Sequence, residues 1–129
     1  MELRKSFIEN TSGIQHLGIP TLDIGATIRF YEGLGFDVIW QDPGKVAFLQ
    51  LGTLVIETYT GEGAAMKNGA IDHVALNVKD IEAAWKDAQA AGYETNDTAI
   101  NYLPFFENGV KFFTIIGPNR EKVEFNQYL

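Results

Sequence analysis

The clearest pattern in the chain is an alternation of apolar and polar positions at residues 71–78. Such an alternation predicts a strand with one side packed against helices and the other side carrying His73 among small or polar residues. Asp80 stands where a helix N-cap belongs, an apolar face at helical spacing follows, and Gly92 suits the turn after a helix. A strand followed by a helix is therefore predicted between residues 71 and 92.

The same arrangement occurs earlier in the chain, which indicates an internal duplication. Identical residues recur 57 positions later, without a gap, at six places in the first copy: Ile14, His16, Asp23, Ile24, Ala26 and Gly35. A period close to half the chain indicates duplication within one domain rather than a solenoid. The first copy is accordingly predicted to begin with a strand at 14–19, followed by a helix.

In the first half, three further strands are expected after the helix. The apolar runs place them at 36–40, 45–51 and 53–59, with the last two joined as a hairpin at Gly52. The small and polar stretch 61–70 that follows is interpreted as the linker between the halves.

The second half is predicted to repeat this order. Its strands are placed at 93–96, 110–116 and 121–127, with a longer, aromatic-rich connection at 97–108. The polar N-terminal stretch 1–12 is interpreted as an arm, either free or docked on a partner subunit.

Each half is thus an α+β unit in which a helix covers one face of a four-stranded sheet. The other face stays open and becomes concave as the sheet twists. We expect the half-repeats 14–60 and 71–128 to pair around a local two-fold axis, enclosing a cleft within a single domain, 1–129.

Composition narrows the functional class. The 129 residues are 46% hydrophobic, which suffices for one domain with a core. The absence of cysteine excludes disulfides and thiolate metal ligands. A net charge of −7 and the lack of a basic stripe argue against nucleic acids and anionic membranes as partners. Neither a signal peptide nor a membrane span is recognisable, so we expect a cytoplasmic protein.

Four polar side chains are predicted to project from the open sheet faces at matching places. They are the chain's only two histidines, His16 and His73, on the first strands, and Glu57 and Glu124 on the fourth strands. Taken singly, each has an ordinary explanation as a hydrogen-bonded or solvated residue. Together, two imidazoles and two carboxylates suit a divalent first-row metal with open coordination positions. A metal would also compensate the carboxylate of Glu57, which stands in an otherwise apolar strand.

Four segments carry a resemblance to a known family: 14–20, 30–36, 71–78 and 113–125. In this order they resemble the vicinal oxygen chelate superfamily, which includes glyoxalase I, bleomycin resistance proteins and extradiol dioxygenases. The resemblance covers nearly the whole chain from Ile14 onward. It implies a fold of two βαβββ repeats paired around a pseudo-two-fold axis.

The resemblance is closest to the glyoxalase I branch. Glyoxalase I uses His or Gln, then Glu, His and Glu, and this chain has His16, Glu57, His73 and Glu124 at those positions. Dioxygenases and fosfomycin-modifying enzymes lack the acid at the Glu57 position, the epimerase branch typically has an amide there, and bleomycin-binding members lack the set. The resemblance therefore implies a divalent metal cofactor (Ni, Co, Zn, Mn or Fe).

The implied reaction is that of a lactoylglutathione lyase-like metalloenzyme. A hemithioacetal or related hydroxy-carbonyl compound would lose a proton next to its carbonyl, and the metal would stabilise the enediolate as a Lewis acid. Glu124 would be the catalytic base, and Glu57 could serve the opposite face of the substrate. Pro20 stands where glyoxalase I carries a glutathione-binding arginine, so another thiol or a small hydroxy-carbonyl compound stays open as substrate.

Two other function classes stay open. One is a different metal-dependent reaction of the same fold, such as epimerisation, dioxygenation or thiol transfer. The other is a metal-free drug- or ligand-binding resistance protein, in which Trp40, Phe48 and Tyr59 would bind a cationic aromatic compound. For every one of these functions we expect a homodimer, with the site either within one chain or shared between subunits. The aromatic residues of 97–108 would form a lid, a pocket wall or an ordinary packing contact.

Overall fold

A computed structural model describes residues 2–61, 63–69 and 71–129 of the chain. The chain forms two compact units, Met1–Gly63 and Ala64–Leu129. Their boundary falls within the predicted linker 61–70, of which residues 62 and 70 lie outside the described part. Each unit holds one of the two repeats, and their union into a single domain stays a prediction.

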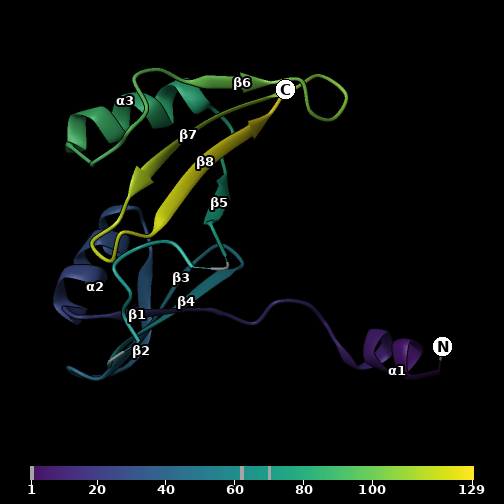
Figure 1. Ribbon diagram of the computed structural model, residues 1–129, viewed down its shortest axis with the longest axis vertical. Coiled ribbons are helices and arrows are strands. Elements are labelled where there is room, and N and C mark those ends of the chain that lie inside the picture. The colour runs from purple at the N-terminus through teal and green to yellow at the C-terminus, as the bar shows by residue number, and fades with distance from the viewer. Residues whose placement is uncertain (1, 62, 70) are drawn as a thin grey trace. The chain divides into compact units, whose positions relative to one another are not determined.

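The first unit has the order of elements that the repeat predicts (Figure 1). After a helix α1 (Glu2–Asn10), its elements are β1 (Leu17–Thr21), α2 (Ile24–Gly33), β2 (Asp37–Asp42), β3 (Val46–Leu51) and β4 (Leu54–Thr60). The strands form a sheet in the order β1-β4-β3-β2. The first and last strands of the repeat, β1 and β4, pair in parallel, and the other pairs are antiparallel.

The second unit repeats this topology. Its elements are β5 (His73–Asn77), α3 (Ile81–Ala91), β6 (Asn101–Leu103), β7 (Val110–Ile116) and β8 (Lys122–Tyr128). The sheet order is β5-β8-β7-β6, again with a parallel pair between the first and last strands. The predicted α+β architecture of two βαβββ units is therefore confirmed.

Both predicted N-caps are present and start the helices. The Asp23 carboxylate accepts a hydrogen bond from the Ala26 N–H at 3.0 Å, and Asp80 accepts one from Ala83 at 3.1 Å. Each satisfies an amide that the helix itself leaves without a partner, which is worth about 1 kcal/mol. Gly92 ends α3 with a φ of 73°, a left-handed conformation that glycine adopts without steric cost.

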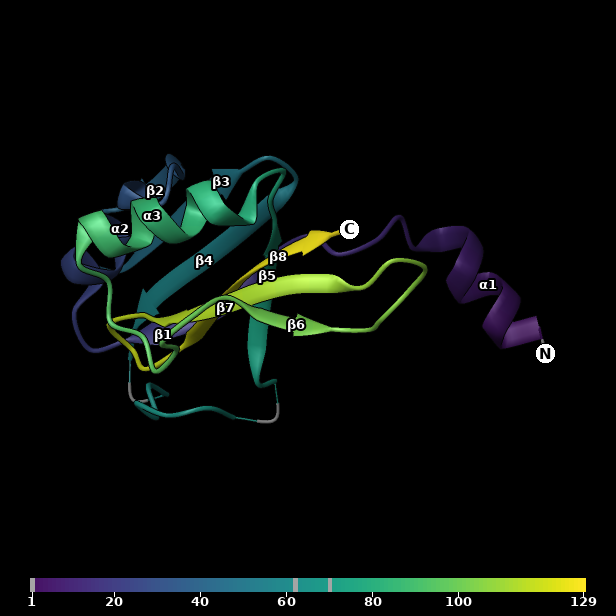
Figure 2. The ribbon, with the colours of Figure 1, turned by 90° about the horizontal axis from the view of Figure 1, so that it is seen from above.

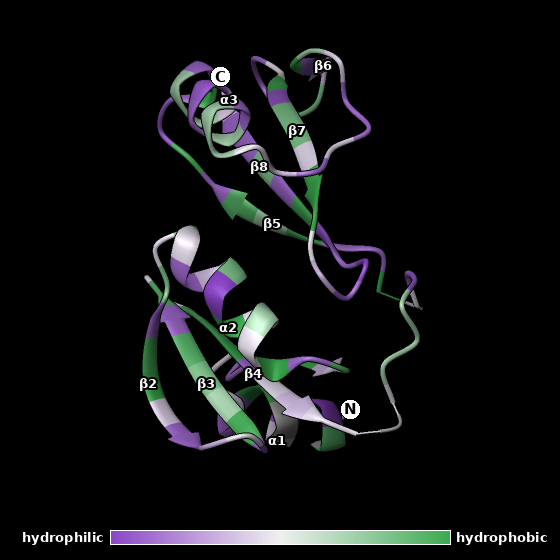
Figure 3. Cartoon of the chain, turned by 90° about the vertical axis from the view of Figure 1, so that its left-hand side faces the viewer, coloured by the Kyte–Doolittle hydropathy of each residue, from purple (hydrophilic) through white to green (hydrophobic). Residues whose placement is uncertain are grey.

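The helices decide which sheet face is covered. In the first unit α2 packs on β3 and β4, where Leu49 and Ile56 are fully buried. In the second unit α3 packs on β7 and β8 (Figure 2). Phe113 and Val123 of these strands are fully buried. Figure 3 shows the apolar residues along β3 and β7 that supply much of this packing. Because side chains alternate along a strand, the residues between these buried positions point to the helix-free face.

One predicted strand is wrong. Residues 93–96 form no strand, and the fourth strand of the second sheet is instead β6, within the predicted connection 97–108. Beside this segment, the main-chain N–H and carbonyl of Thr114 in β7 form hydrogen bonds with side chains. The Thr114 N–H donates to the Asp97 carboxylate at 2.7 Å, and the Thr95 hydroxyl donates to the Thr114 carbonyl at 2.5 Å. The Ile116 N–H also donates to the Glu94 carbonyl at 2.8 Å, but this single main-chain bond does not continue as a ladder, and the segment forms no strand.

The first strand of each repeat begins later than predicted. β1 begins at Leu17 and β5 at His73, whereas Ile14 and Ile71 are 77% and 70% exposed and contribute nothing to the core. The N-terminal arm contains α1, whose Leu3 and Ile8 are exposed. No helix in the described part of the chain combines the length and the apolar character needed to cross a membrane.

Candidate functional site

In the first unit, the structure brings His16 and Glu57 together on the sheet face opposite α2. Gly18 of β1 is the parallel register partner of Glu57 on β4, and His16 precedes Gly18 by two residues. Residues two apart in an extended chain project to the same side, so the imidazole lies over the carboxylate. Its Nε2 is 3.3 Å from Glu57 Oε1, and both side chains are partly exposed, by 35% and 27%.

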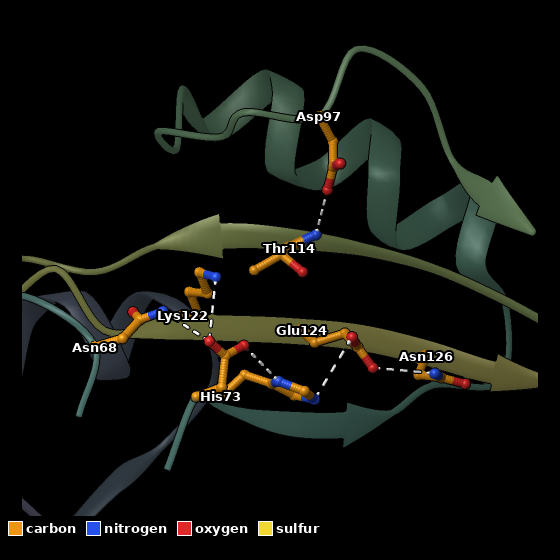
Figure 4. A network of polar contacts seen from close by, with 8 residues as sticks. Asn68, His73, Asp97, Thr114, Lys122, Glu124 and Asn126 are labelled. Atoms are coloured by element: carbon orange, nitrogen blue, oxygen red, sulfur yellow. Dashed lines mark hydrogen bonds and ion pairs between the residues drawn. The ribbon is translucent and has the colours of Figure 1, made fainter. Parts of the chain in front are cut away.

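The second unit contains an equivalent pair, His73 and Glu124. Ala75 is the register partner of Glu124, and His73 precedes Ala75 by two residues. His73 Nε2 lies 3.8 Å from Glu124 Oε1, and the glutamate side chain is 14% exposed (Figure 4). The other carboxylate oxygen of Glu124 accepts a hydrogen bond from the Asn126 side chain at 3.0 Å. Each of the four predicted site residues is thus close to its partner within its own unit.

The second ring nitrogen of each histidine is held by the residue that precedes it. His16 Nδ1 is 2.9 Å from the Gln15 side-chain oxygen, and His73 Nδ1 is 3.0 Å from Asp72 Oδ2. Since these oxygens accept hydrogen bonds, the hydrogen of the neutral ring belongs on Nδ1 and the lone pair on Nε2. That lone pair then faces a carboxylate oxygen, which also carries lone pairs. At separations of 3.3 and 3.8 Å, the two acceptors of each pair are placed where a cation could bind to both of them.

This donor set fits a divalent metal ion. Imidazole nitrogen and carboxylate oxygen are normal ligands of first-row metals, and a metal-binding histidine usually donates its other N–H to a nearby acceptor. Among the described residues of either unit, no three histidine or acidic side chains form a metal-binding cluster. Each unit by itself therefore supplies two ligands, His16 with Glu57 or His73 with Glu124.

Aromatic side chains surround the pair of the first unit. Phe48 on β3 is the register partner of Glu57, and its ring contacts the His16 ring edge-on with centroids 5.6 Å apart. The Trp40 ring lies 6.1 Å from the Phe48 ring and is 57% exposed. Tyr59 follows Glu57 by two residues and so shares its face. The first pair consequently lies against an apolar, partly open aromatic surface.

The pair of the second unit lies in a pocket of about 270 Å³ that is lined by both polar and apolar side chains. The lining residues come from β5 and the residue before it, from β7 and β8, and from the segment before β6: Asp72, His73, Asn96, Asp97, Phe112, Thr114, Ile116, Lys122 and Glu124. Thr114 takes the place across from Glu124 that Phe48 takes across from Glu57. The two pairs are therefore alike in their ligands and different in their surroundings.

The charge of Asp72 is stabilised by its neighbours. The hydrogen bond to His73, followed by that to Lys122, lowers the pKa of the Asp72 carboxyl below its ordinary value. Lys122 Nζ lies 3.4 Å from Asp72 Oδ1. Asp72 is therefore a carboxylate at neutral pH, and it presents a full negative charge to the histidine ring.

Sequence reasoning found the four ligand candidates but missed Gln15, Asp72 and Asn126. The signal for the first two was available, since both directly precede a histidine and both are hydrogen-bond acceptors. Asn126 was harder to find, because its role depends on a side-chain direction within β8. The glutamates are 67 residues apart rather than 57, since the second half is longer between its helix and its last two strands.

The fold and the pairs define an α+β protein with two βαβββ units, each presenting a His–Glu pair on its open sheet face. Residues 13–102 match the family model described as the Glyoxalase/Bleomycin resistance protein/Dioxygenase superfamily. The chain belongs to this superfamily.

Individual relatives agree with this assignment. The chain is 35% identical over 126 residues to the uncharacterized protein YwbC of Bacillus subtilis (strain 168), with 88% of this chain and 96% of the relative covered. Its structure is similar to a lactoylglutathione lyase from Agrobacterium tumefaciens, with a TM-score of 0.69, 16% identity and coverage of 91% and 94% of the two chains. It is also similar to a bleomycin resistance determinant encoded on the transposon Tn5, with a TM-score of 0.70, 21% identity and coverage of 90% and 98%. At these identities the two solved structures establish the shared fold alone.

Proposed function

We propose that the protein is a metal-dependent lyase or isomerase of the glyoxalase I type, acting on a hemithioacetal or a related hydroxy-carbonyl compound. The observation that carries the proposal is the geometry of the two pairs, in which each histidine turns the lone pair of Nε2 toward a glutamate. His16, Glu57, His73 and Glu124 would together hold one divalent cation. Membership of the Glyoxalase/Bleomycin resistance protein/Dioxygenase superfamily supports the same choice of chemistry.

The side chains of this chain would divide the work as follows. A bound divalent metal would supply Lewis acidity toward the substrate oxygens. Glu124 would accept the proton from the carbon next to the carbonyl and return it to the neighbouring carbon. This transfer moves hydrogen within the substrate, so the reaction needs no external oxidant or reductant. Asn126 fixes one oxygen of Glu124 and leaves the other directed toward His73, which orients the base.

Glu57 would serve the opposite face of the substrate. Phe48 lies across from Glu57 on the neighbouring strand, where Thr114 lies across from Glu124, so the two carboxylates would meet different parts of a substrate. Glu57 is proposed as a ligand and as the proton acceptor for a substrate of opposite configuration. A cytoplasmic location and a homodimer complete the proposal.

Two measurements on the purified protein test this function. The first is element analysis after purification and after incubation with Ni, Co, Zn, Mn or Fe salts. The second follows conversion of methylglyoxal in the presence of a panel of thiols, with and without a chelator. Metal-dependent isomerisation is the expected result. A protein that binds metal but acts only in an epimerase, dioxygenase or thiol-transfer assay would replace the lyase with a different reaction of the same site.

A second function is favoured by the aromatic surface of the first unit. Trp40 is 57% exposed beside Phe48, which is the arrangement expected of a platform for a flat, cationic compound. The protein would then sequester a ligand without converting it. Trp85, the other tryptophan, packs against Phe113 with ring centroids 5.0 Å apart, so a Trp85→Phe variant would leave Trp40 as a fluorescent reporter. Tight quenching by cationic aromatic compounds, with no bound metal, would favour this function over the lyase.

A further inference from the structure

We propose that Asp72 is a positioning residue that makes His73 a stronger metal ligand than His16. The inference rests on the proposed metal centre and goes beyond it, because it assigns unequal roles to two histidines that the repeat makes equivalent. The carboxylate of Asp72 contacts the far side of the His73 ring, so it acts through His73 and does not itself bind the metal.

The position of Asp72 is fixed by contacts to both of its oxygens. The partners in these contacts, Asn68, His73 and Lys122, are labelled in Figure 4. Its Oδ1 accepts hydrogen bonds from the Asn68 side chain at 2.8 Å and from Lys122 Nζ at 3.4 Å. Its Oδ2 is then left to accept from His73 Nδ1 at 3.0 Å. Donors from the segment before β5 and from β8 thereby hold the carboxylate beside the histidine.

The chemical effect follows from the charge of the acceptor. A carboxylate that accepts the Nδ1 hydrogen fixes the tautomer of the ring and increases the electron density on Nε2. The same Nε2 lies 3.8 Å from Glu124 Oε1, at the place where a cation would be held. Lys122 and Asn68 therefore hold Asp72, and Asp72 in turn holds the His73 ring, whose Nε2 faces the proposed metal.

The first unit provides an internal comparison. Gln15 occupies the position equivalent to Asp72, 57 residues earlier, and accepts from His16 Nδ1 at 2.9 Å. The two hydrogen bonds have nearly the same length, but the amide oxygen of Gln15 carries no net charge. Charge-assisted hydrogen bonds are roughly twice as strong as neutral ones. The chain thus contains the same ligand twice, supported once by a charged acceptor and once by a neutral one.

An ordinary surface ion pair between Asp72 and Lys122 would make a different prediction. The two side chains are 58% and 38% exposed, and exposed ion pairs contribute little to stability. If Asp72 only formed such a pair, its removal would leave both the His73 ring and metal binding unchanged. The ring and the metal affinity are therefore the quantities that separate a positioning role from a surface contact.

The experiment compares Asp72→Asn, Asp72→Ala and the matched control Gln15→Ala with the wild-type chain. Asp72→Asn keeps an acceptor and removes the charge, whereas Asp72→Ala removes both. Affinity for Co or Zn is measured by competition with a chromogenic chelator. The tautomer of each histidine in the metal-free protein is read from its ring nitrogen shifts by NMR, and thermal unfolding checks the fold.

We expect Asp72→Ala to lower metal affinity by about 10- to 100-fold, Asp72→Asn by less, and Gln15→Ala least of all. His73 should be the Nδ1–H tautomer in the wild type and should lose that preference in Asp72→Ala, while the variant still unfolds cooperatively. Wild-type metal affinity that persists in both Asp72 variants would overturn this inference and leave the proposed function standing. If the wild-type chain bound no metal, the proposed function and this inference would both be rejected.

Discussion

His73 Nε2 faces Glu124 Oε1 across 3.8 Å, a separation too long for a hydrogen bond. Donor atoms that each lie about 2.0–2.2 Å from a metal are separated from one another by about 3–3.5 Å. The His73–Glu124 distance, and the 3.3 Å distance between His16 and Glu57, are close to that separation. A small adjustment of either side chain would let both members of a pair bind one cation, which is why we interpret the pairs as halves of a metal centre.

The proposed roles of the two glutamates predict different effects of the same substitution. Glu124→Gln should lower kcat by about 10²–10⁴-fold, because an amide cannot accept the proton, while retaining part of the metal. Steady-state kinetics and element analysis of the same sample measure both effects. Glu57→Gln should retain activity on one substrate configuration better than on the other. Full turnover by Glu124→Gln would contradict its assignment as the base.

The hydrogen bonds of Asp97 predict that this residue stabilises the fold and takes no part in the proposed reaction. Its carboxylate accepts hydrogen bonds from the Thr114 N–H and from the Asn101 side chain, at 2.7 and 3.1 Å. Asp97→Ala should therefore lower the free energy of unfolding by about 1–3 kcal/mol, since the amide of β7 loses its partner. Denaturant unfolding measures this change, with Asp87→Ala on the exposed face of α3 as the control. Equal stability of the two variants would show that side chains do not replace the strand contacts here.

The lowered pKa of Asp72 predicts a pH effect with a definite sign. A carboxyl whose pKa is lower in the folded state stabilises the fold above its ordinary pKa, and that contribution disappears as the pH falls through the lowered value. An NMR titration should place the Asp72 pKa below its ordinary value. His73→Ala should raise it more than Lys122→Met does, because the hydrogen bond from His73 is the larger cause. A larger effect of Lys122→Met would reverse this order.

Much of the fold was predictable because the same sequence pattern occurs in both halves of the chain. The alternation at each histidine, the aspartate N-caps and the glycines after the helices are local signals, and duplication makes each one more reliable. The misplaced strand at 93–96 shows the limit of such signals. There, the side chains of Asp97 and Thr95 form hydrogen bonds with the main chain of Thr114 that a neighbouring strand would otherwise form. The spacing of apolar residues gives no sign of such side-chain contacts.

For the candidate site, the four ligand residues were predictable from the sequence. Residue type and repeat position identified His16, His73, Glu57 and Glu124, because histidine is rare in this chain and each one begins a strand-like segment. The supporting contacts were not predictable in the same way. Asp72 accepts hydrogen bonds from Lys122, which is distant in sequence, and from Asn68, which lies in the segment before β5. The contact with Lys122 can be inferred only when the register of β5 and β8 is known.

The number of metal ions bound per chain tests the central claim most directly. If the four residues hold one cation, element analysis and calorimetric titration should give one metal per chain, and His16→Ala or His73→Ala alone should remove nearly all tight binding. This result holds whether the two pairs come from one chain or from two subunits. Two metals per chain, one lost in each variant while the other remains, would contradict the account, because each unit would then bind its own ion.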